Sequence, residues 1–328
     1  MNNIFQKLLL LFLSIITTIL LLEVALRLTG STAFIKEYVK KPKIYIQDNV
    51  LGWNTKEGNY FYDIDSENKV NFYFLNDGSR FSGKELNEQN NSKKIILVGG
   101  SFTMGHKINN EETISFYLQE SFENLDVKNH GVGGYGTYQS FLKLKKIFKT
   151  NKNIKYVFYS FIDHHESRNI GDVTYLEGLS MMSEDLVYFP YVSLNNKENI
   201  IEHAPIKYLI LPFSNFSVLV SKIQKKIMRI IIKSKYDDKQ LITKKLIRKM
   251  DNLSKKNGST FVFVNLLSYE SIKNNYEKFA LNNNILFLDC QIKNFEKYTS
   301  KKIDYHPNAQ GNKKYSKCLE KFIKNYVK

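Results

Sequence analysis

From about residue 92 onward, the hydrophobic positions switch repeatedly between the spacing of a strand and the spacing of a helix. Short apolar or aromatic runs at 95–98, 154–161 and 260–266 are typical of buried strands. Between them, 137–150 and 241–256 carry apolar residues at the intervals of an amphipathic helix. Because strands that alternate with helices build parallel sheets with helices on both faces, we predict an α/β fold with a doubly wound sheet.

Further short strands are predicted to begin at Val127 and Ile285, which brings the sheet to five strands. Further helices are predicted over 111–124, 271–282 and 309–326.

Two long segments interrupt this rhythm. Residues 34–91 are irregular and rich in aromatic residues, and Asp77-Gly78 predicts a turn between short strands. The segment 170–238 contains a basic amphipathic helix at 213–233. Such a helix could lie on a membrane surface or pack on the domain with its basic face in water, and we favour the second interpretation.

The N-terminus is uncharged from Leu8 to Leu22 and stays apolar to Leu28 apart from Glu23 and Arg27. This pattern fits a signal peptide or a membrane anchor. We favour an uncleaved anchor, because no small residues follow the apolar run at once. The body of the protein is then expected on the extracytoplasmic side. The predicted organisation is an anchor at 1–30, a lead-in segment at 31–91, and a catalytic domain at 92–328 with the insertion inside it.

Charge and cysteine content narrow the function classes. The net charge of +16 comes from lysines scattered along the whole chain, without a basic motif that interleaves stacking aromatics, so we expect no nucleic-acid partner. The two cysteines, Cys290 and Cys318, lack metal-ligand spacing and suggest neither a zinc site nor a disulfide framework.

Four loops at strand ends carry residues suited to catalysis. In parallel sheets, ligands bind beyond the carboxyl ends of the strands, which is where these loops lie. A serine hydroxyl needs a base to take its proton, so Ser101 needs an imidazole nearby. His306 is the candidate base, and Asp304, two residues earlier, can hold its other ring nitrogen. Glycine N–H groups between 131 and 136 could stabilise an oxyanion. The four loops are 99–101, 129–136, 161–165 and 304–308.

Other glycine-rich motifs do not fit. No P-loop lysine follows Gly99-Gly100-Ser101, and the G-x-G-x-x-G spacing of dinucleotide folds is absent. The G-x-S-x-G elbow fails as well, because Thr103 occupies its last position.

Taken together and in this order, the motifs resemble the SGNH, or GDSL-like, hydrolase family, in its membrane-anchored bacterial type. The first block of that family is similar to 99–105, the second to 129–139 and the last to 304–311. The resemblance implies a three-layer, flavodoxin-like fold with a five-stranded parallel sheet. It also implies Ser101 as nucleophile, Asp304 and His306 as acid and base, and the N–H groups of Ser101 and Gly134 as oxyanion donors.

Two positions depart from the family pattern. Gly100 stands where an aspartate usually precedes the serine, and no asparagine follows the strand that ends near 161. His164 is the candidate replacement for that asparagine as an oxyanion donor. Asp163 and Arg168 are possible auxiliary residues, the arginine adding positive charge.

The resemblance therefore implies an esterase that removes acyl groups, acetyl foremost, from a carbohydrate or lipid ester, without a metal or cofactor. Its partners would be the ester substrate and the membrane that holds the N-terminal helix. Two alternatives stay open: an O-acyltransferase that modifies surface polysaccharide with the same residues, and a non-catalytic module that binds a glycan or lipid.

Overall fold

The computed structural model describes residues 3–36, 43–63, 69–84, 92–183, 187–300 and 305–326. The chain forms two compact units. The first comprises Met1–Val39, Val173–Val187 and Lys207–Lys233. The second comprises Lys40–Asp172, Tyr188–Ile206 and Ser234–Lys328.

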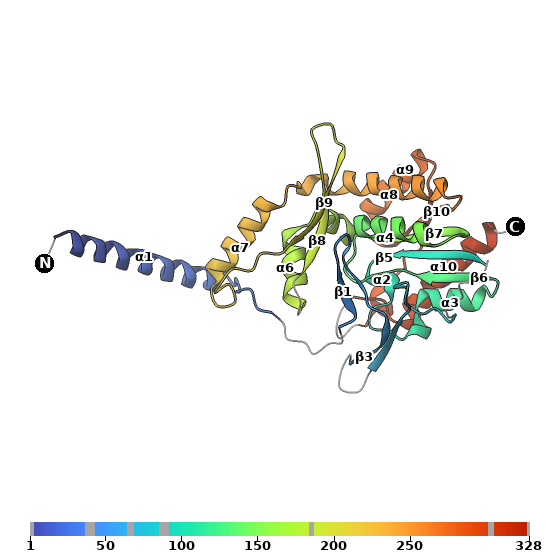
Figure 1. The fold of residues 1–328 in the computed structure, drawn as a ribbon, viewed down its shortest axis with the longest axis horizontal. Coiled ribbons are helices and arrows are strands. Elements are labelled where there is room, and N and C mark those ends of the chain that lie inside the picture. Colours follow the sequence, from blue (N-terminus) through green and yellow to red (C-terminus); the bar gives the residue numbers. More distant parts are fainter. Residues whose placement is uncertain are drawn as a thin grey trace. The chain divides into compact units, whose positions relative to one another are not determined.

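The larger unit is built on a five-stranded parallel sheet in the order β11-β10-β7-β5-β6 (Figure 1). Numbered along the chain and read from β6, the strands of this sheet have the order 2-1-3-4-5, which is the flavodoxin-like order. The predicted fold class is confirmed. The strands are β5 (Lys93–Gly99), β6 (Leu125–Asn129), β7 (Ile154–Ile162), β10 (Thr260–Leu267) and β11 (Leu286–Asp289).

Helices cover both faces of this sheet, because alternate residues of its buried strands point to opposite sides. On one face, Val98 and Tyr159 pack with α4 (Thr137–Thr150), α8 (Lys239–Lys256) and α9 (Glu270–Asn282). On the other face, their neighbours Leu97 and Phe158 pack with α3 (Ile114–Ser121) and α10 (Ala309–Tyr326). Figure 1 shows these layers above and below the sheet.

The helix predicted at 111–124 begins later than expected. A 3-10 turn occupies Asn110–Glu112, and α3 starts at Ile114 because the Thr113 side chain caps it by accepting the Phe116 N–H. Two short helices, α2 (Ser101–Met104) and α5 (His164–Asn169), follow directly on β5 and β7. Short 3-10 turns lie at Tyr236–Asp238 and Phe295–Tyr298.

Three antiparallel hairpins join the larger unit. They are β1 (Tyr45–Asp48) with β2 (Gly52–Thr55), β3 (Gly58–Asp63) with β4 (Lys69–Phe74), and β8 (Tyr188–Leu194) with β9 (Ile200–Lys207). After β4 the chain turns at Asp77-Gly78, as predicted, and Arg80 then pairs with Asn129 at the end of β6. The lead-in is thereby hydrogen-bonded to the edge of the parallel sheet.

The smaller unit contains α1 (Asn3–Leu28), α6 (Val173–Met182) and α7 (Val218–Ile231). Within the part of the chain that the structure describes, α1 is the one helix long and apolar enough to cross a membrane, with a mean hydropathy of 2.6. Its last turns are tied to α7: the Glu23 carboxylate accepts hydrogen bonds from Ser217 Oγ at 2.8 Å, Val218 N at 2.9 Å and Leu219 N at 3.0 Å. Glu23 therefore caps the start of α7.

Cys290 and Cys318 form a disulfide, with Cα atoms 5.8 Å apart. Sequence spacing suggested no disulfide framework here, and that interpretation was wrong. The residues lie 28 positions apart in sequence, but Cys290 directly follows β11 and Cys318 lies on α10, which packs against this end of the sheet. The pairing is a product of the tertiary fold.

Candidate active site

The predicted nucleophile, Ser101, lies where β5 meets α2, at the carboxyl end of a central strand. Both preceding glycines are required by close packing. A Cβ atom on Gly99 would lie 2.2 Å from Thr103 Oγ1, and a Cβ atom on Gly100 would lie 2.9 Å from His165 Nε2. A side chain at either glycine would therefore displace Thr103 or His165 from its present position.

His306 completes a Ser–His pair. Its Nε2 lies 2.8 Å from Ser101 Oγ, which is hydrogen-bond distance for proton transfer from a nucleophile to a base. The ring packs against Phe102 and His106, with centroid distances of 5.5 Å and 4.6 Å. Asp304 lies outside the described residues, so its role in holding His306 stays a prediction.

A buried arginine holds the chain that follows the nucleophile. Arg80 is 1% exposed and donates to four backbone carbonyls and one side-chain oxygen. Burial lowers the pKa of Arg80 to about 9, but the guanidinium stays charged at neutral pH. The lead-in segment therefore supports the active site through this residue. Its acceptors are the carbonyls of Asn71, Met104, Gly105 and Ile108 and the Oδ1 of Asn110.

The glycine-rich loop after β6 is braced against the nucleophile helix by Asn129. Its amide nitrogen donates to the Thr103 carbonyl at 2.8 Å, and its amide oxygen accepts the Gly131 N–H at 3.0 Å. Gly134 adopts φ +81°, a left-handed conformation that favours glycine. Its assignment as oxyanion donor stays a prediction.

The end of β7 brings a different histidine to the nucleophile from the one expected. The His164 side chain is 76% exposed, and its Nε2 lies 3.8 Å from the Asp163 carboxylate. His165, the next residue, is 1% exposed and directs Nε2 at Gly100. His164 and His165 are the first two residues of α5, and successive side chains on a helix point about 100° apart, so the two adjacent histidines face different surroundings.

Arg168, predicted as an auxiliary residue, does reach the nucleophile turn. Its Nη1 lies 3.2 Å from the position of a Cβ atom on Gly100 and donates to the Tyr135 carbonyl at 3.0 Å. Arg168 thus brings positive charge beside the turn and links the loops after β6 and β7.

Sequence reasoning missed the functions of three residues here. Arg80 lies in the lead-in segment just after the predicted Asp77-Gly78 turn, and no sequence pattern there indicates that it is buried. His106 lies next to His306 in the structure. In the sequence it directly follows the first block, 99–105, and belongs to no recognisable motif. His165 lies in the loop predicted at 161–165, and its position next to another histidine is the one signal that the sequence offers.

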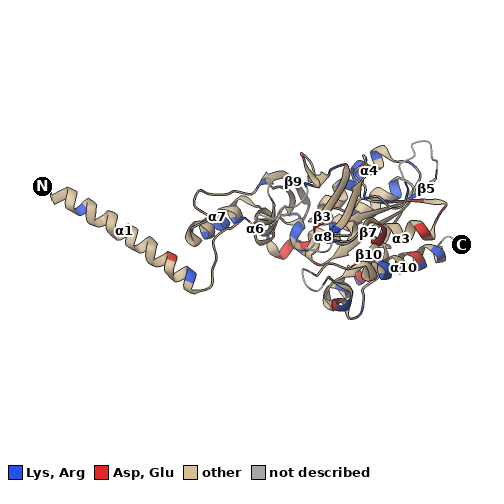
Figure 2. Ribbon diagram, turned by 90° about the horizontal axis from the view of Figure 1, so that it is seen from below, with Lys and Arg blue, Asp and Glu red and all other residues tan. Residues whose placement is uncertain are grey.

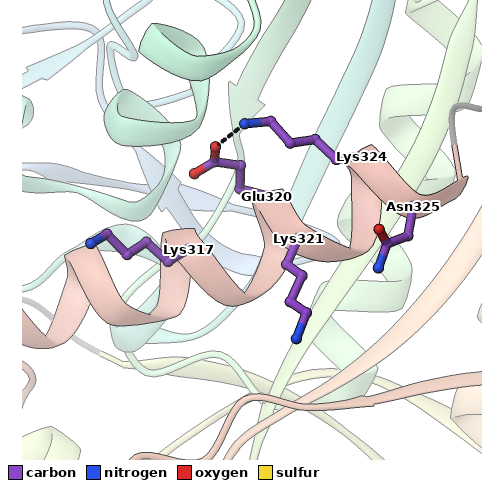
Figure 3. Close-up of a pocket in the computed structure, with 5 residues that line it drawn as sticks. All are labelled: Lys317, Glu320, Lys321, Lys324 and Asn325. Atoms are coloured by element: carbon purple, nitrogen blue, oxygen red, sulfur yellow. Dashed lines mark hydrogen bonds and ion pairs between the residues drawn. The ribbon is translucent and has the colours of Figure 1, made fainter.

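A shallow surface hollow of about 290 Å³ lies elsewhere, over one stretch of α10 (Figure 3). Its side chains are polar or charged and include an ion pair between Lys324 and Glu320. It contains neither Ser101 nor His306. Among the residues that the structure describes, no group of three or more histidine, cysteine, aspartate or glutamate side chains could hold a metal ion.

The sequence matches no known family model and no curated protein. Among solved structures, the chain is similar to a member of the lipolytic protein G-D-S-L family from Veillonella parvula, at 12% identity and a TM-score of 0.41, over 71% of this chain and 99% of that one. It is also similar to the psychrotrophic esterase EstA from Pseudoalteromonas sp., at 9% identity and a TM-score of 0.41, over 72% and 99%. At these values we take the fold and the site from this chain's own residues.

Proposed function

We propose that the chain is a serine-dependent ester hydrolase of the SGNH type. The observation that carries this proposal is the 2.8 Å contact between His306 Nε2 and Ser101 Oγ at the carboxyl edge of a flavodoxin-like sheet. Two residues 205 positions apart meet there with the geometry of a nucleophile and its base.

In the proposed reaction, Ser101 Oγ attacks the carbonyl carbon of the ester while its proton passes to His306 Nε2. The tetrahedral intermediate then expels the alcohol, which takes that proton, and leaves an acyl group on Ser101. Water attacks the acyl-enzyme while His306 Nε2 takes its proton, and the bond between the acyl carbon and Ser101 Oγ then breaks. His306 returns the proton to Ser101 Oγ, and the acid leaves. Asp304 would hold Nδ1–H of the base, and the N–H groups of Ser101 and Gly134 would stabilise the oxyanion.

The substrate we propose is a short acyl ester, acetyl foremost, of a carbohydrate or lipid. Ser101 is only 7% exposed, and a nucleophile with so little exposed surface favours a small acyl group over a long chain.

To test the function, we would assay p-nitrophenyl esters of two to twelve carbons with the full chain in detergent. The wild type, Ser101→Ala and His306→Ala would be compared, and a fluorophosphonate probe would report labelling of Ser101. We expect turnover that is highest for acetate and lost in both variants. A wild type without turnover and without labelling would remove the basis of the proposal and favour the binding-module alternative.

We further propose that α1 is retained as a membrane anchor. Figure 2 shows the helix without charged residues between Lys7 and Glu23. The α7 cap supplied by Glu23 supports retention, since cleavage after the helix would remove the acceptor of three hydrogen bonds. The disulfide supports an extracytoplasmic location for the larger unit, because such bonds persist in oxidising compartments.

The intact mass of the protein purified from membranes tests the anchor. We expect the mass of the full chain, and extraction by detergent but not by carbonate. A mass lacking about thirty N-terminal residues would show instead that the segment is a cleaved signal.

A further inference from the structure

The helix α7 has three different faces, and one of them packs within the smaller unit. The packing face consists of four buried side chains, of which two are polar: Val218, Ser221, Gln224 and Met228. The polar ones are held by specific contacts. Ser221 Oγ accepts the Phe34 N–H at 2.9 Å, and Gln224 Oε1 accepts the Leu211 N–H at 2.7 Å. These hydrogen bonds fix which side of α7 faces the unit.

The second face of α7 is apolar and lies outside this packing. It is formed by four isoleucines whose spacing places them on one side of a helix: Ile223, Ile227, Ile230 and Ile231. Three of the four are exposed, and the Ile230 side chain is exposed to 76%. Water favours the opposite arrangement, in which isoleucines are buried and the side chains of Ser221 and Gln224 are exposed. An exposed apolar face of this kind marks a contact with an apolar partner.

The third face of α7 is basic. Lys222, Lys226 and Arg229 each directly precede an isoleucine of the second face, so the two faces lie about 100° apart around the helix. None of these three side chains has an ion-pair partner among the residues that the structure describes, whereas Lys225 pairs with Glu177 of α6 at 2.5 Å. Figure 2 shows the basic residues along α7. An apolar face beside a basic face is the pattern of helices that lie in a membrane interface.

The start of α7 is fixed to the end of α1 (Figure 1). Glu23 is the first charged residue after the uncharged run from Leu8 to Leu22, and its carboxylate accepts the Val218 N–H at 2.9 Å. Arg27 Nη2 donates to the Phe216 carbonyl at 2.5 Å. Charged residues near the end of a spanning helix lie at the boundary between hydrocarbon and headgroups. In a chain anchored by α1, α7 therefore begins at that depth.

The loop that leads into α7 exposes two aromatic side chains at the same end of α1. Phe213 and Phe216 are both strongly exposed. Phe213 has φ +65°, a left-handed conformation that is uncommon for a bulky side chain. Its carbonyl accepts the N–H groups of Phe216 and Ser217 at 3.0 Å and 2.9 Å, so the turn that exposes both rings is held by hydrogen bonds. Phenylalanine is a typical apolar residue of helices and segments that enter the interface.

We propose that α7 lies in the interface of the membrane that α1 spans, with its isoleucine face among the acyl chains and its basic face against the headgroups of anionic phospholipids. Phe213 and Phe216 enter the same layer beside the end of α1. This inference rests on the proposed retention of α1. It replaces the interpretation favoured from the sequence, in which the basic face of this helix lies in water. The smaller unit is then held at two points, which fixes its orientation on the bilayer.

Spin labels on the full chain test the depth of the two exposed faces. Ile230→Cys and its control Lys226→Cys would be labelled and reconstituted in vesicles of phosphatidylcholine and phosphatidylglycerol in equal parts. The native cysteines are paired, so the label attaches to the introduced thiol. Collisions with oxygen report on hydrocarbon, and collisions with a water-soluble nickel chelate report on water. We expect more oxygen and fewer nickel collisions in the Ile230→Cys protein than in the Lys226→Cys protein.

Vesicles of phosphatidylcholine alone test the basic face. Each lysine or arginine beside an anionic surface contributes about fivefold to membrane binding, so three amount to about 10²-fold. We expect the Ile230→Cys label to collide more often with nickel in these neutral vesicles. Adding Lys222→Gln, Lys226→Gln and Arg229→Gln to the Ile230→Cys chain provides the matched variant. In anionic vesicles it should show the nickel accessibility that the unaltered basic face shows in neutral ones.

The outcomes separate this inference from the anchor beneath it. Equal nickel collisions at both positions, in protein whose mass is that of the full chain, would place α7 in water and refute this inference alone. A label in Ile230→Cys shielded from oxygen as well as from nickel would show contact with protein and also overturn it. Shielding that does not depend on lipid charge would refute the role of the basic face. A mass without the N-terminal helix would refute the anchor, and this inference with it.

Discussion

The disulfide between Cys290 and Cys318 closes a loop of 28 residues that contains His306, the proposed base. Opening it, by reduction or by replacing both cysteines with alanine, should destabilise the protein. For a loop of this length, loop-closure entropy in the unfolded chain amounts to about 3–4 kcal/mol at 25 °C. With an m-value of about 3 kcal/mol/M, the urea midpoint should fall by about 1 M.

The assay follows urea unfolding of the full chain in detergent by the fluorescence of Trp53, the one tryptophan of the chain, with and without reductant. Trp53 reports on the larger unit because it packs against Tyr135 and Phe189. Alkylation of the unfolded protein, followed by mass measurement, counts free thiols. We expect none before reduction and two after it.

The double alanine variant is the matched control for the reductant. It should show the lower midpoint at once and should not respond to reductant. Two alkylated thiols in unreduced protein from an oxidising compartment, or a midpoint unchanged by reduction, would refute the reasoning and remove the support that the disulfide gives to an extracytoplasmic location.

Three further predictions follow from buried contacts. Gly100→Ala should lower kcat at least tenfold, because the added Cβ would lie 2.9 Å from His165 Nε2. The control is Gly178→Ala, whose Cβ would meet nothing within 4 Å and which should leave kcat unchanged. Arg80→Met should lower the free energy of unfolding, measured by urea denaturation, by roughly 3 kcal/mol or more, because four backbone carbonyls would lose their hydrogen-bond donor. An unchanged urea midpoint would contradict a structural role for Arg80. Burial lowers the pKa of His130 to about 3 and that of His165 well below its usual value. The stability that depends on these neutral rings is complete above the unfolded pKa of about 6.5 and is lost as the pH falls below it, so the urea midpoint should be lower at pH 5 than at pH 7, and equal midpoints would be inconsistent with it.

The sheet could be predicted from the sequence because its three inner strands, β5, β7 and β10, are buried on both faces and read as largely apolar runs. Val157, Phe158 and Tyr159, for example, are all fully buried, although they face alternate sides. The boundaries of α3 were less predictable, since they depend on which polar side chain caps the helix. Thr113 does so, and the glutamates before it form a separate 3-10 turn.

The nucleophile and base could be predicted as a pair, because Ser101 and His306 each lie in a distinctive short motif at a strand end. Which of the two histidines after β7 lies beside the nucleophile turn could not be predicted. His164 and His165 are chemically identical, and only their burial distinguishes them. The disulfide was missed for a related reason: spacing along the chain carries no information when β11 and α10 bring the two cysteines together only in the fold.

The distance in sequence between nucleophile and base has a consequence for biosynthesis. Ser101 emerges from the ribosome 205 residues before His306, and the base is held in a loop that must first be positioned by β11 and α10. The nascent chain would therefore carry a serine without its base during most of its translation. Catalytic competence would arise only when the last helix docks, which makes labelling of Ser101 a reporter of completed folding.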